Sequence, residues 1–176
     1  MREVEAKIVL RDCALLEGVE GRLARLGARL EGEVREVDLY FQHPCRDFAE
    51  TDEALRLREV DGRCELTYKG PKEGGRVKAR LEATVEVSDC SEAKLILEKL
   101  GFQPVAVVEK KRRYYTLGSV SVTLDEVKGL GCFVEIESKS GSEEEVLEAM
   151  KALGLEGFET TTKSYLELLL EKRGGC

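Results

Sequence analysis

The sequence predicts an α+β fold: a closed eight-stranded, mostly antiparallel β-barrel with a charged interior and helices packed outside. Two observations predict it. Most expected strands alternate charged and apolar side chains, which therefore point to opposite faces. The apolar face needs covering by four amphipathic helices, which turns the charged face inward, and closure removes open sheet edges. A sheet with one face in water would show the same alternation and is the alternative.

Length and composition limit the class of protein. With 176 residues, 42% hydrophobic and 36% charged, the chain suits one folded domain with a sizeable core. We expect a single domain over residues 1–173 and a short flexible tail at 174–176. The net charge of −7 argues against non-specific binding to nucleic acid or membrane surfaces, but it allows a locally basic cavity.

Cysteine usage and the absence of a recognisable leader bear on location. The six cysteines include no C-x-x-C pair and the chain has one histidine, which does not resemble a zinc site. No signal peptide or long hydrophobic span is apparent, so we expect a cytoplasmic protein with reduced thiols. High charge with few Asn and Gln is equally compatible with a thermophilic source, in which disulfides would be less surprising.

Hydrophobic periodicity and capping signals place the elements. A first helix is expected after Asp12 as its N-cap, and a second begins after Ser91 and ends at Leu100. A third opens with a capping box at Ser142 and ends at Leu153, and a fourth covers 162–172. The eight strands are expected near residues 2–10, 34–42, 54–60, 63–69, 77–87, 105–116, 119–126 and 131–138.

Two internal similarities suggest a duplication. Residues 5–13 resemble residues 82–90, and residues 57–62 parallel residues 124–129. A helix ending in Leu-Gly and then a strand follow each member of the first pair. The chain is therefore interpreted as two related halves of four strands each, with chance similarity as the alternative.

The inward faces carry two kinds of charge on different strands. Such a lining is costly unless the charges are hydrated, paired or occupied by a ligand. Carboxylates suit Mg²⁺ or Mn²⁺, and Arg and Lys suit phosphate oxygens, so a triphosphate carried with its metal fits both sets. Acidic positions fall on the first, seventh and eighth strands: Glu3, Glu5, Asp125, Glu135 and Glu137. Basic positions fall on the third to sixth: Arg56, Arg58, Lys69, Arg80 and either Lys110 with Arg112 or Lys111 with Arg113.

These motifs, in order along almost the whole chain, resemble the CYTH superfamily of triphosphate tunnel enzymes. Residues 37–48, 51–58, 124–131 and 163–165 look closest to its class IV adenylyl cyclase branch. The motifs are Glu3-x-Glu5-x-Lys7, Arg56-x-Arg58, Lys69, Arg80-x-Glu82, a Lys-x-Arg pair, Asp125 and Glu135-x-Glu137.

The resemblance implies a role for each position. It implies metal ligation by Glu3, Glu5, Asp125, Glu135 and Glu137. It implies triphosphate binding by Lys7, Arg56, Arg58, Lys69, Arg80, Lys110 and Arg112. Catalysis would rest on Glu5, Lys7, Asp125 and Glu135, and Glu82 and Glu86 would support it by ligating metal or orienting an arginine. Lys110 and Arg112 are chosen because residues 108–115 match a Val-x-Lys-x-Arg-x-x-Tyr pattern, although strand periodicity allows the neighbouring pair.

The resemblance also implies an activity. An adenylyl cyclase would use Mg²⁺ or Mn²⁺, two ions during turnover, while the ribose 3′-hydroxyl of ATP attacks the α-phosphorus and expels pyrophosphate. The alternative is a triphosphatase acting on inorganic, nucleoside or thiamine triphosphate, and a third hypothesis is a non-catalytic polyphosphate-binding module. The expected partner is a small-molecule triphosphate, without nucleic acid or membrane. The helix over 162–172 would pack on the barrel or on a second subunit of a homodimer.

Overall fold

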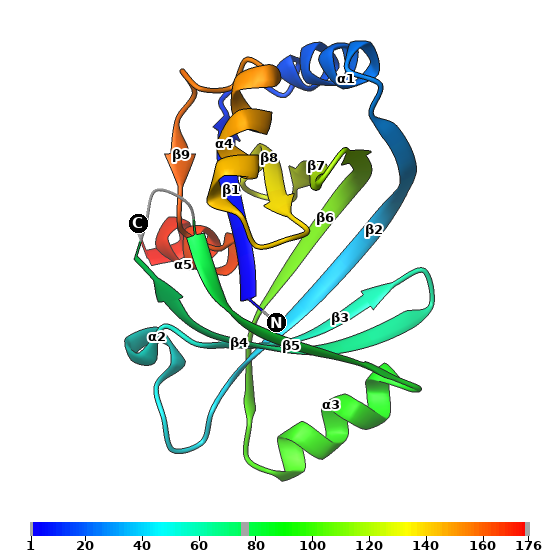
Figure 1. Cartoon of the computed structure of the whole chain (residues 1–176). Helices are drawn as coiled ribbons and strands as arrows, with labels where there is room; N and C mark the ends of the chain where they lie inside the picture. The colour runs from blue at the N-terminus through cyan, green and yellow to red at the C-terminus, as the bar shows by residue number, and fades with distance from the viewer. Residues whose placement is uncertain (1, 75–77, 175–176) are drawn as a thin grey trace.

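The computed structural model describes residues 2–74 and 78–174, and its strands close into a barrel (Figure 1). Eight strands follow one another in the order β5-β4-β3-β2-β6-β7-β8-β1, and β1 pairs again with β5. All the described pairings are antiparallel, which confirms the predicted closed barrel. The strands are β1 (Arg2–Leu10), β2 (Arg29–Gln42), β3 (Ala54–Val60), β4 (Arg63–Glu73), β5 (Lys78–Val87), β6 (Gln103–Leu117), β7 (Val120–Val127) and β8 (Gly131–Ser138).

Five helices and one short outer strand complete the described chain. The helices are α1 (Leu15–Arg25), α2 (Phe48–Thr51), α3 (Cys90–Lys99), α4 (Glu143–Ala152) and α5 (Tyr165–Gly174). Strand β9 (Thr160–Thr161) is not part of the eight-stranded ring and pairs with β1 at Lys7 and Ile8. Neither α2 nor β9 was predicted, since segments of four and two residues are too short for a periodic pattern to show.

Three of the predicted helix starts were wrong, including that of the helix expected over 162–172, which begins at Tyr165. The Asp12 carboxylate accepts a hydrogen bond from the Ala14 backbone N–H at 2.9 Å, and this local turn delays α1 until Leu15. The second helix begins at Cys90, because the Asp89 side chain caps it by accepting from the Glu92 N–H. The predicted Ser142 cap of α4 is confirmed.

Four helices cover the outer, apolar face of the barrel. Helices α1 and α4 pack on β1, β7 and β8, where Ile8, Val134 and Ile136 are fully buried. Helices α2 and α3 pack on the opposite side, where Phe48 and Leu97 contact a cluster from β2, β3 and β4. None of the helices within residues 2–74 and 78–174 is long and apolar enough to cross a membrane.

Helix α5 packs differently, over one end of the barrel. Tyr165 and Leu169 contact Tyr40, Val108 and Phe133, which lie on the inner faces of β2, β6 and β8. The interior is therefore apolar at the end that α5 covers and charged beyond it. Gly174 ends α5, whereas the remainder of the predicted tail and the predicted first residue of the fifth strand, Val77, lie outside the described residues.

The order of the elements repeats once along the chain. The series β1-α1-β2-β3-β4 is followed by β5-α3-β6-β7-β8, with α2 inserted between β2 and β3. The repeat matches the predicted halves in position. A common origin of the halves remains a prediction.

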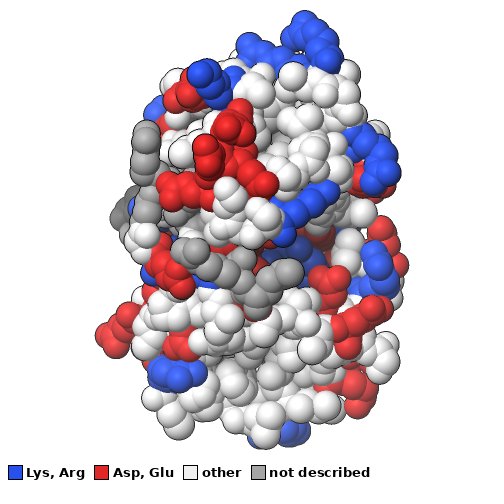
Figure 2. Space-filling model, in the orientation of Figure 1, with Lys and Arg blue, Asp and Glu red and all other residues white. Residues whose placement is uncertain are grey.

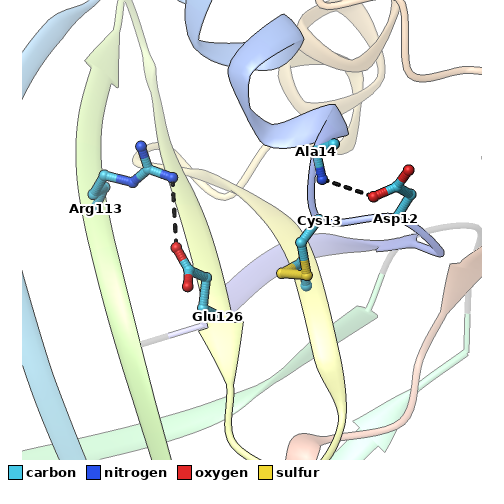
Figure 3. The surroundings of a disulfide bond; sticks show 6 residues. Asp12, Cys13, Ala14, Arg113 and Glu126 are labelled. Carbon is cyan, nitrogen blue, oxygen red and sulfur yellow. Dashed lines mark hydrogen bonds and ion pairs between the residues drawn. A yellow bond between two sulfur atoms is a disulfide. The ribbon is translucent and has the colours of Figure 1, made fainter.

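Two disulfide bonds tie the outer elements to the barrel. Cys13, before α1, is bonded to Cys132 at the start of β8 (Figure 3), and Cys64 on β4 is bonded to Cys90 in α3. The expectation of reduced thiols is therefore wrong for these four residues. The partners are 119 and 26 residues apart, and only the folded strand register brings them together. Cys45 is exposed and forms no disulfide with a described residue, and Cys176 lies outside the described part.

Candidate functional site in the barrel interior

The barrel encloses a cavity of about 230 Å³ that side chains from all eight ring strands line. In Figure 2, basic atoms are recessed in the hollow between the upper and lower parts of the molecule, with acidic atoms nearby on the surface. The lining carries seven basic and six acidic side chains, so it offers opposite charges both to a small polyanion and to a cation. Of the predicted site residues, the cavity brings together Glu3, Glu5, Lys7, Arg56, Arg58, Lys69, Arg80, Glu82, Lys110, Arg112, Glu135 and Glu137.

Two predicted site residues do not line this cavity. Asp125 points inward on β7 but is fully buried behind Arg112. Glu86 is exposed on β5. On β6 the structure places Lys110 and Arg112 inside the barrel, whereas Lys111 is exposed on the outside. Figure 3 shows Arg113 with Glu126 on that outer side.

One wall of the cavity belongs to an ion-pair network in which Asp38, Arg58, Lys110 and Arg112 line the cavity and Glu36 and Asp125 are buried next to them. Strand register builds its centre, because Asp38 on β2 lies directly opposite Arg58 on β3. Arg58 donates two hydrogen bonds to Asp38, at 2.7 and 2.8 Å, and Lys110 donates a third at 2.7 Å. Burial alone would raise the pKa of Asp38, but Lys110 and Arg58 hold it well below its ordinary value. This carboxylate therefore stays ionised.

The second half of the network centres on Arg112, which lies opposite Asp125 across β6 and β7. Its Nε donates to Asp125 Oδ1 at 2.6 Å, and its Nη2 is 2.5 Å from Glu135 Oε2. Glu36 joins the two halves, with its Oε2 lying 3.0 Å from both Lys110 Nζ and Arg58 Nη2. Each charge in the network thus has an opposite charge in contact, which fixes the side chains in place.

A different part of the lining is an acidic cluster of Glu3, Glu5, Glu82 and Glu137. Glu5 and Glu137 lie directly opposite each other across β1 and β8, a placement that repels like charges. Burial and the neighbouring carboxylates of Glu3, Glu5 and Glu82 raise the pKa of Glu137 to about 7. The Glu137 side chain nevertheless lines the cavity. Lys69 offsets part of the charge, 3.1 Å from Glu3 and 2.9 Å from Glu82.

Two arginines, Arg56 and Arg80, are buried in the lining without a carboxylate. Their exposed fractions are 7% and 3%. Arg56 makes one hydrogen bond, to Thr67 Oγ1 at 3.3 Å, and its Nε has no partner. Arg80 donates to the backbone carbonyls of Gly70 and Asp52, at 2.7 and 3.2 Å. Within the described chain, neither guanidinium has a carboxylate oxygen within 4.0 Å, so both positive charges are available to an anion.

Lys7 lies where β1 meets α5. Its Nζ is 3.2 Å from Glu135 Oε1, donates to the Lys163 carbonyl at 3.0 Å and lies 4.1 Å above the Tyr165 ring. The Tyr165 hydroxyl in turn donates to Asp125 at 2.6 Å. One aromatic residue therefore positions both a predicted phosphate-binding cation and a predicted metal ligand.

Sequence reasoning missed five residues of this site. Glu36, Asp38 and Tyr40 alternate on β2, so period two could have identified them had the polar face of that strand been read. Tyr114, whose hydroxyl donates to Glu36, lies within residues 108–115, whose pattern match was used only to choose Lys110 and Arg112. Tyr165 follows β9 and starts a helix, so no strand periodicity could have placed it in the cavity.

The acidic side chains of the cavity resemble a site for a divalent cation in chemistry but not in spacing. No three His, Cys, Asp or Glu side chains among the described residues are already gathered closely enough to hold an ion. The acidic cluster nevertheless supplies only carboxylate oxygens, the donors that Mg²⁺ and Mn²⁺ prefer, and its mutual repulsion would be relieved by a cation. Its chemistry fits the metal.

Comparisons with known proteins agree with the geometry. A CYTH domain is matched over residues 1–165. The chain is 39% identical over 176 residues to "Putative adenylate cyclase MJ0240" of Methanocaldococcus jannaschii, covering 96% of this chain and 98% of the relative. It is 29% identical to adenylate cyclase CyaB of Aeromonas hydrophila, over 76% of this chain and 72% of that one. The structure of PH1819 from Pyrococcus horikoshii OT3 superposes with a TM-score of 0.82, at 41% identity, over 97% of this chain and 99% of that chain.

Proposed function

This chain belongs to the CYTH family, and from that premise we propose that it is a metal-dependent enzyme that converts ATP to cyclic AMP and pyrophosphate. The triphosphate lies in the barrel cavity. The names of the two adenylate cyclase relatives support the choice of reaction. The cavity supports the choice of ligand.

The observation that carries the proposal is the contrast between paired and unpaired cations in one cavity. Arg58, Lys110 and Arg112 already have carboxylate partners, whereas Arg56 and Arg80 have none within the described chain. A buried guanidinium without a counter-charge is costly unless an anion occupies the site. Planar Arg groups match phosphate oxygens with two parallel hydrogen bonds, so we assign Arg56 and Arg80 to the triphosphate.

The remaining side chains act by position and charge. The ion-pair network keeps Arg58, Lys110 and Arg112 in fixed rotamers, so little reorganisation is needed as negative charge builds on the leaving pyrophosphate. Lys7, fixed between Glu135 and Tyr165, adds a point charge on the same cavity wall. During cyclisation the bond from the ribose 3′-oxygen to the α-phosphorus forms as the bond to pyrophosphate breaks, and the hydroxyl proton is released to solvent.

The acidic residues would hold the divalent ion. The family uses divalent metals, and we assign Glu3, Glu5, Glu135 and Glu137 from the cavity lining as its ligands, with Asp125 acting from behind Arg112. A bound Mg²⁺ or Mn²⁺ supplies charge for the phosphate oxygens and lowers the pKa of the attacking hydroxyl.

The reaction is tested by resolving the products. The protein is incubated with ATP and, separately, with inorganic triphosphate, each with Mg²⁺ or Mn²⁺. Cyclic AMP with pyrophosphate is the expected result. ADP with orthophosphate, or pyrophosphate with orthophosphate from inorganic triphosphate, would identify a triphosphatase instead, and binding without turnover would identify a non-catalytic module.

The metal assignment is tested by Glu5→Gln, which keeps the size of the side chain and removes its charge. We expect turnover to fall by more than about 100-fold with the circular dichroism spectrum unchanged. Glu126→Gln is the matched control, because Glu126 is an exposed acid on the outer face of β7. Full activity of Glu5→Gln would show that the metal is held elsewhere.

A further inference from the structure

A row of polar side chains crosses the neighbouring strands β3, β4 and β5 (Figure 1). The strand register places Arg56 opposite Thr67, and Thr67 opposite Thr84. Arg56 Nη2 donates to Thr67 Oγ1 at 3.3 Å, and the hydroxyl oxygens of Thr67 and Thr84 are 3.0 Å apart. Thr67 is fully buried and, unlike Arg56, does not line the cavity. It can therefore act on a ligand in the cavity only through Arg56.

The hydroxyl hydrogens give the row a direction. Thr84 Oγ1 donates to Glu82 Oε1 at 3.3 Å, and a hydroxyl has one hydrogen to donate. Thr67 therefore donates to Thr84, and its oxygen accepts from Arg56. The hydrogen bonds run one way, from the guanidinium through two hydroxyls to a carboxylate, and bonds in such a chain polarise and strengthen one another.

The far end of the row is fixed by charge. Burial would raise the pKa of Glu82, but Lys69, whose Nζ lies 2.9 Å from its carboxylate, lowers it to about 2. An ionised carboxylate only accepts hydrogen bonds, so Glu82 keeps Thr84 in the donating orientation. Lys69 is also 3.1 Å from Glu3, and the row thus connects Arg56 with the acidic cluster.

Arg56 depends on this row more than its neighbour Arg58 does. Two hydrogen bonds to Asp38 fix the guanidinium of Arg58. Within the described chain Arg56 forms no ion pair, and its Nε has no hydrogen-bond partner. A guanidinium binds phosphate well when its planar set of N–H groups already faces the oxygens, because less side-chain freedom is then lost on binding.

We propose that Thr67 is a positioning residue that orients Arg56 towards the triphosphate, with Thr84 and Glu82 completing its support. The inference rests on the proposed function, because it requires Arg56 to bind the triphosphate. Of the two roles that the sequence left open for Glu82, it assigns the orientation of an arginine. The competing explanation is a pair of threonines that stabilises the sheet by contact across two strands.

Thr67→Val and Thr67→Ser form a matched pair, since the first replaces the hydroxyl with a methyl group and the second keeps the hydroxyl and removes the methyl group. Calorimetric titration with inorganic triphosphate in the presence of Mg²⁺ gives the dissociation constant of each variant. We expect Thr67→Val to weaken binding about fivefold, the effect of one lost hydrogen bond, and Thr67→Ser to stay within about twofold of wild type. A larger loss for Thr67→Ser than for Thr67→Val would overturn the inference, because packing would then decide.

Thr84→Val tests the row at an exposed position, where no loss of the fold is expected. It removes the acceptor of the Thr67 hydroxyl, and we expect binding to weaken about threefold. Wild-type affinity in both Thr67→Val and Thr84→Val would overturn the inference and leave the proposed function standing.

A double-mutant cycle tests whether Thr67 acts through Arg56. Arg56→Met removes the guanidinium, so adding Thr67→Val to it should weaken binding by less than about twofold further. A further loss of about fivefold would overturn the inference, since Thr67 would then act independently of Arg56. If the wild-type protein does not bind inorganic triphosphate, the proposed function fails and the inference fails with it.

Discussion

The ion-pair network and the acidic cluster line the same cavity, but they balance their charges in different ways. In the network each carboxylate contacts Arg or Lys, as Asp38 does with Arg58 and Lys110. In the acidic cluster, Glu5 faces Glu137 across two strands, and Lys69 offsets part of the charge of Glu3 and Glu82. The network is complete without a ligand. The cluster gains stability when a cation arrives.

The pKa values record the same difference. Lys110 and Arg58 lower the pKa of Asp38, whereas burial and three neighbouring carboxylates raise that of Glu137 to about 7. On the proposed function, the satisfied network would hold its cationic groups in place for a phosphate, and the acidic cluster would supply oxygens to a metal. Removing a cation should therefore destabilise either region, whereas removing the charge of Glu137 should stabilise the acidic cluster.

The largest effect is expected from Arg58→Met in the network. The change leaves Asp38 and Glu36 with fewer partners in a fully buried position, and we expect the free energy of unfolding to fall by about 3–5 kcal/mol. Urea denaturation measures it. Arg35→Met is the matched control, because Arg35 forms an exposed pair with Glu109 and should contribute less than about 1 kcal/mol. Similar losses for both variants would show that the network does not stabilise the barrel.

A smaller loss is expected from Lys69→Met in the acidic cluster, about 1–2 kcal/mol at pH 7. Burial would raise the pKa of Glu82, but Lys69 lowers it from an ordinary value of 4.5 to about 2. This shift stabilises the fold above pH 4.5, and the stabilisation is lost as pH falls from 4.5 towards 2. In urea denaturation the difference between wild type and variant should therefore shrink as pH falls below 4.5 and vanish only below about pH 2. A difference that persisted there would point to lost packing rather than lost charge.

Glu137→Gln should have the opposite sign. The pKa of Glu137 is about 7 in the fold against an ordinary 4.5, so its contribution to stability is fully present below pH 4.5 and is lost as pH rises through 7. We expect the variant to be more stable than wild type by about 1 kcal/mol at pH 8, a modest value because the cavity opens this side chain to solvent screening. Below pH 4.5 the two should agree. Thermal unfolding with added Mn²⁺ should then favour the wild type, and a variant destabilised at pH 8 without metal would contradict the account.

Much of this arrangement was predictable from strand periodicity. Period two turned Glu3, Glu5 and Lys7 inward, and the need to cover the apolar face predicted the closed barrel. Which charges meet was not predictable, because contacts such as Asp38 with Arg58 depend on the register between strands distant in sequence. The closing of one end by Tyr165 and Leu169 depends on where α5 packs, which helix periodicity does not reveal.

Arg56 and Arg58 show this limit most directly, and they provide the smallest expected change in stability. Both were predicted as equivalent members of one Arg-x-Arg motif, but the structure places Arg58 in the network and leaves Arg56 without a carboxylate in the described chain. Arg56→Met should change the free energy of unfolding by about 1 kcal/mol, less than Arg58→Met, because Arg56 contacts no carboxylate directly and only attracts Asp38 and Glu82 from a distance. It should nevertheless weaken inorganic triphosphate binding at least tenfold, as measured by calorimetric titration, since a charge-assisted contact to phosphate contributes about 1.5–3 kcal/mol. A variant that lost stability as Arg58→Met does, but kept its affinity, would place Arg56 among the structural ion pairs and leave Arg80 alone to receive the anion.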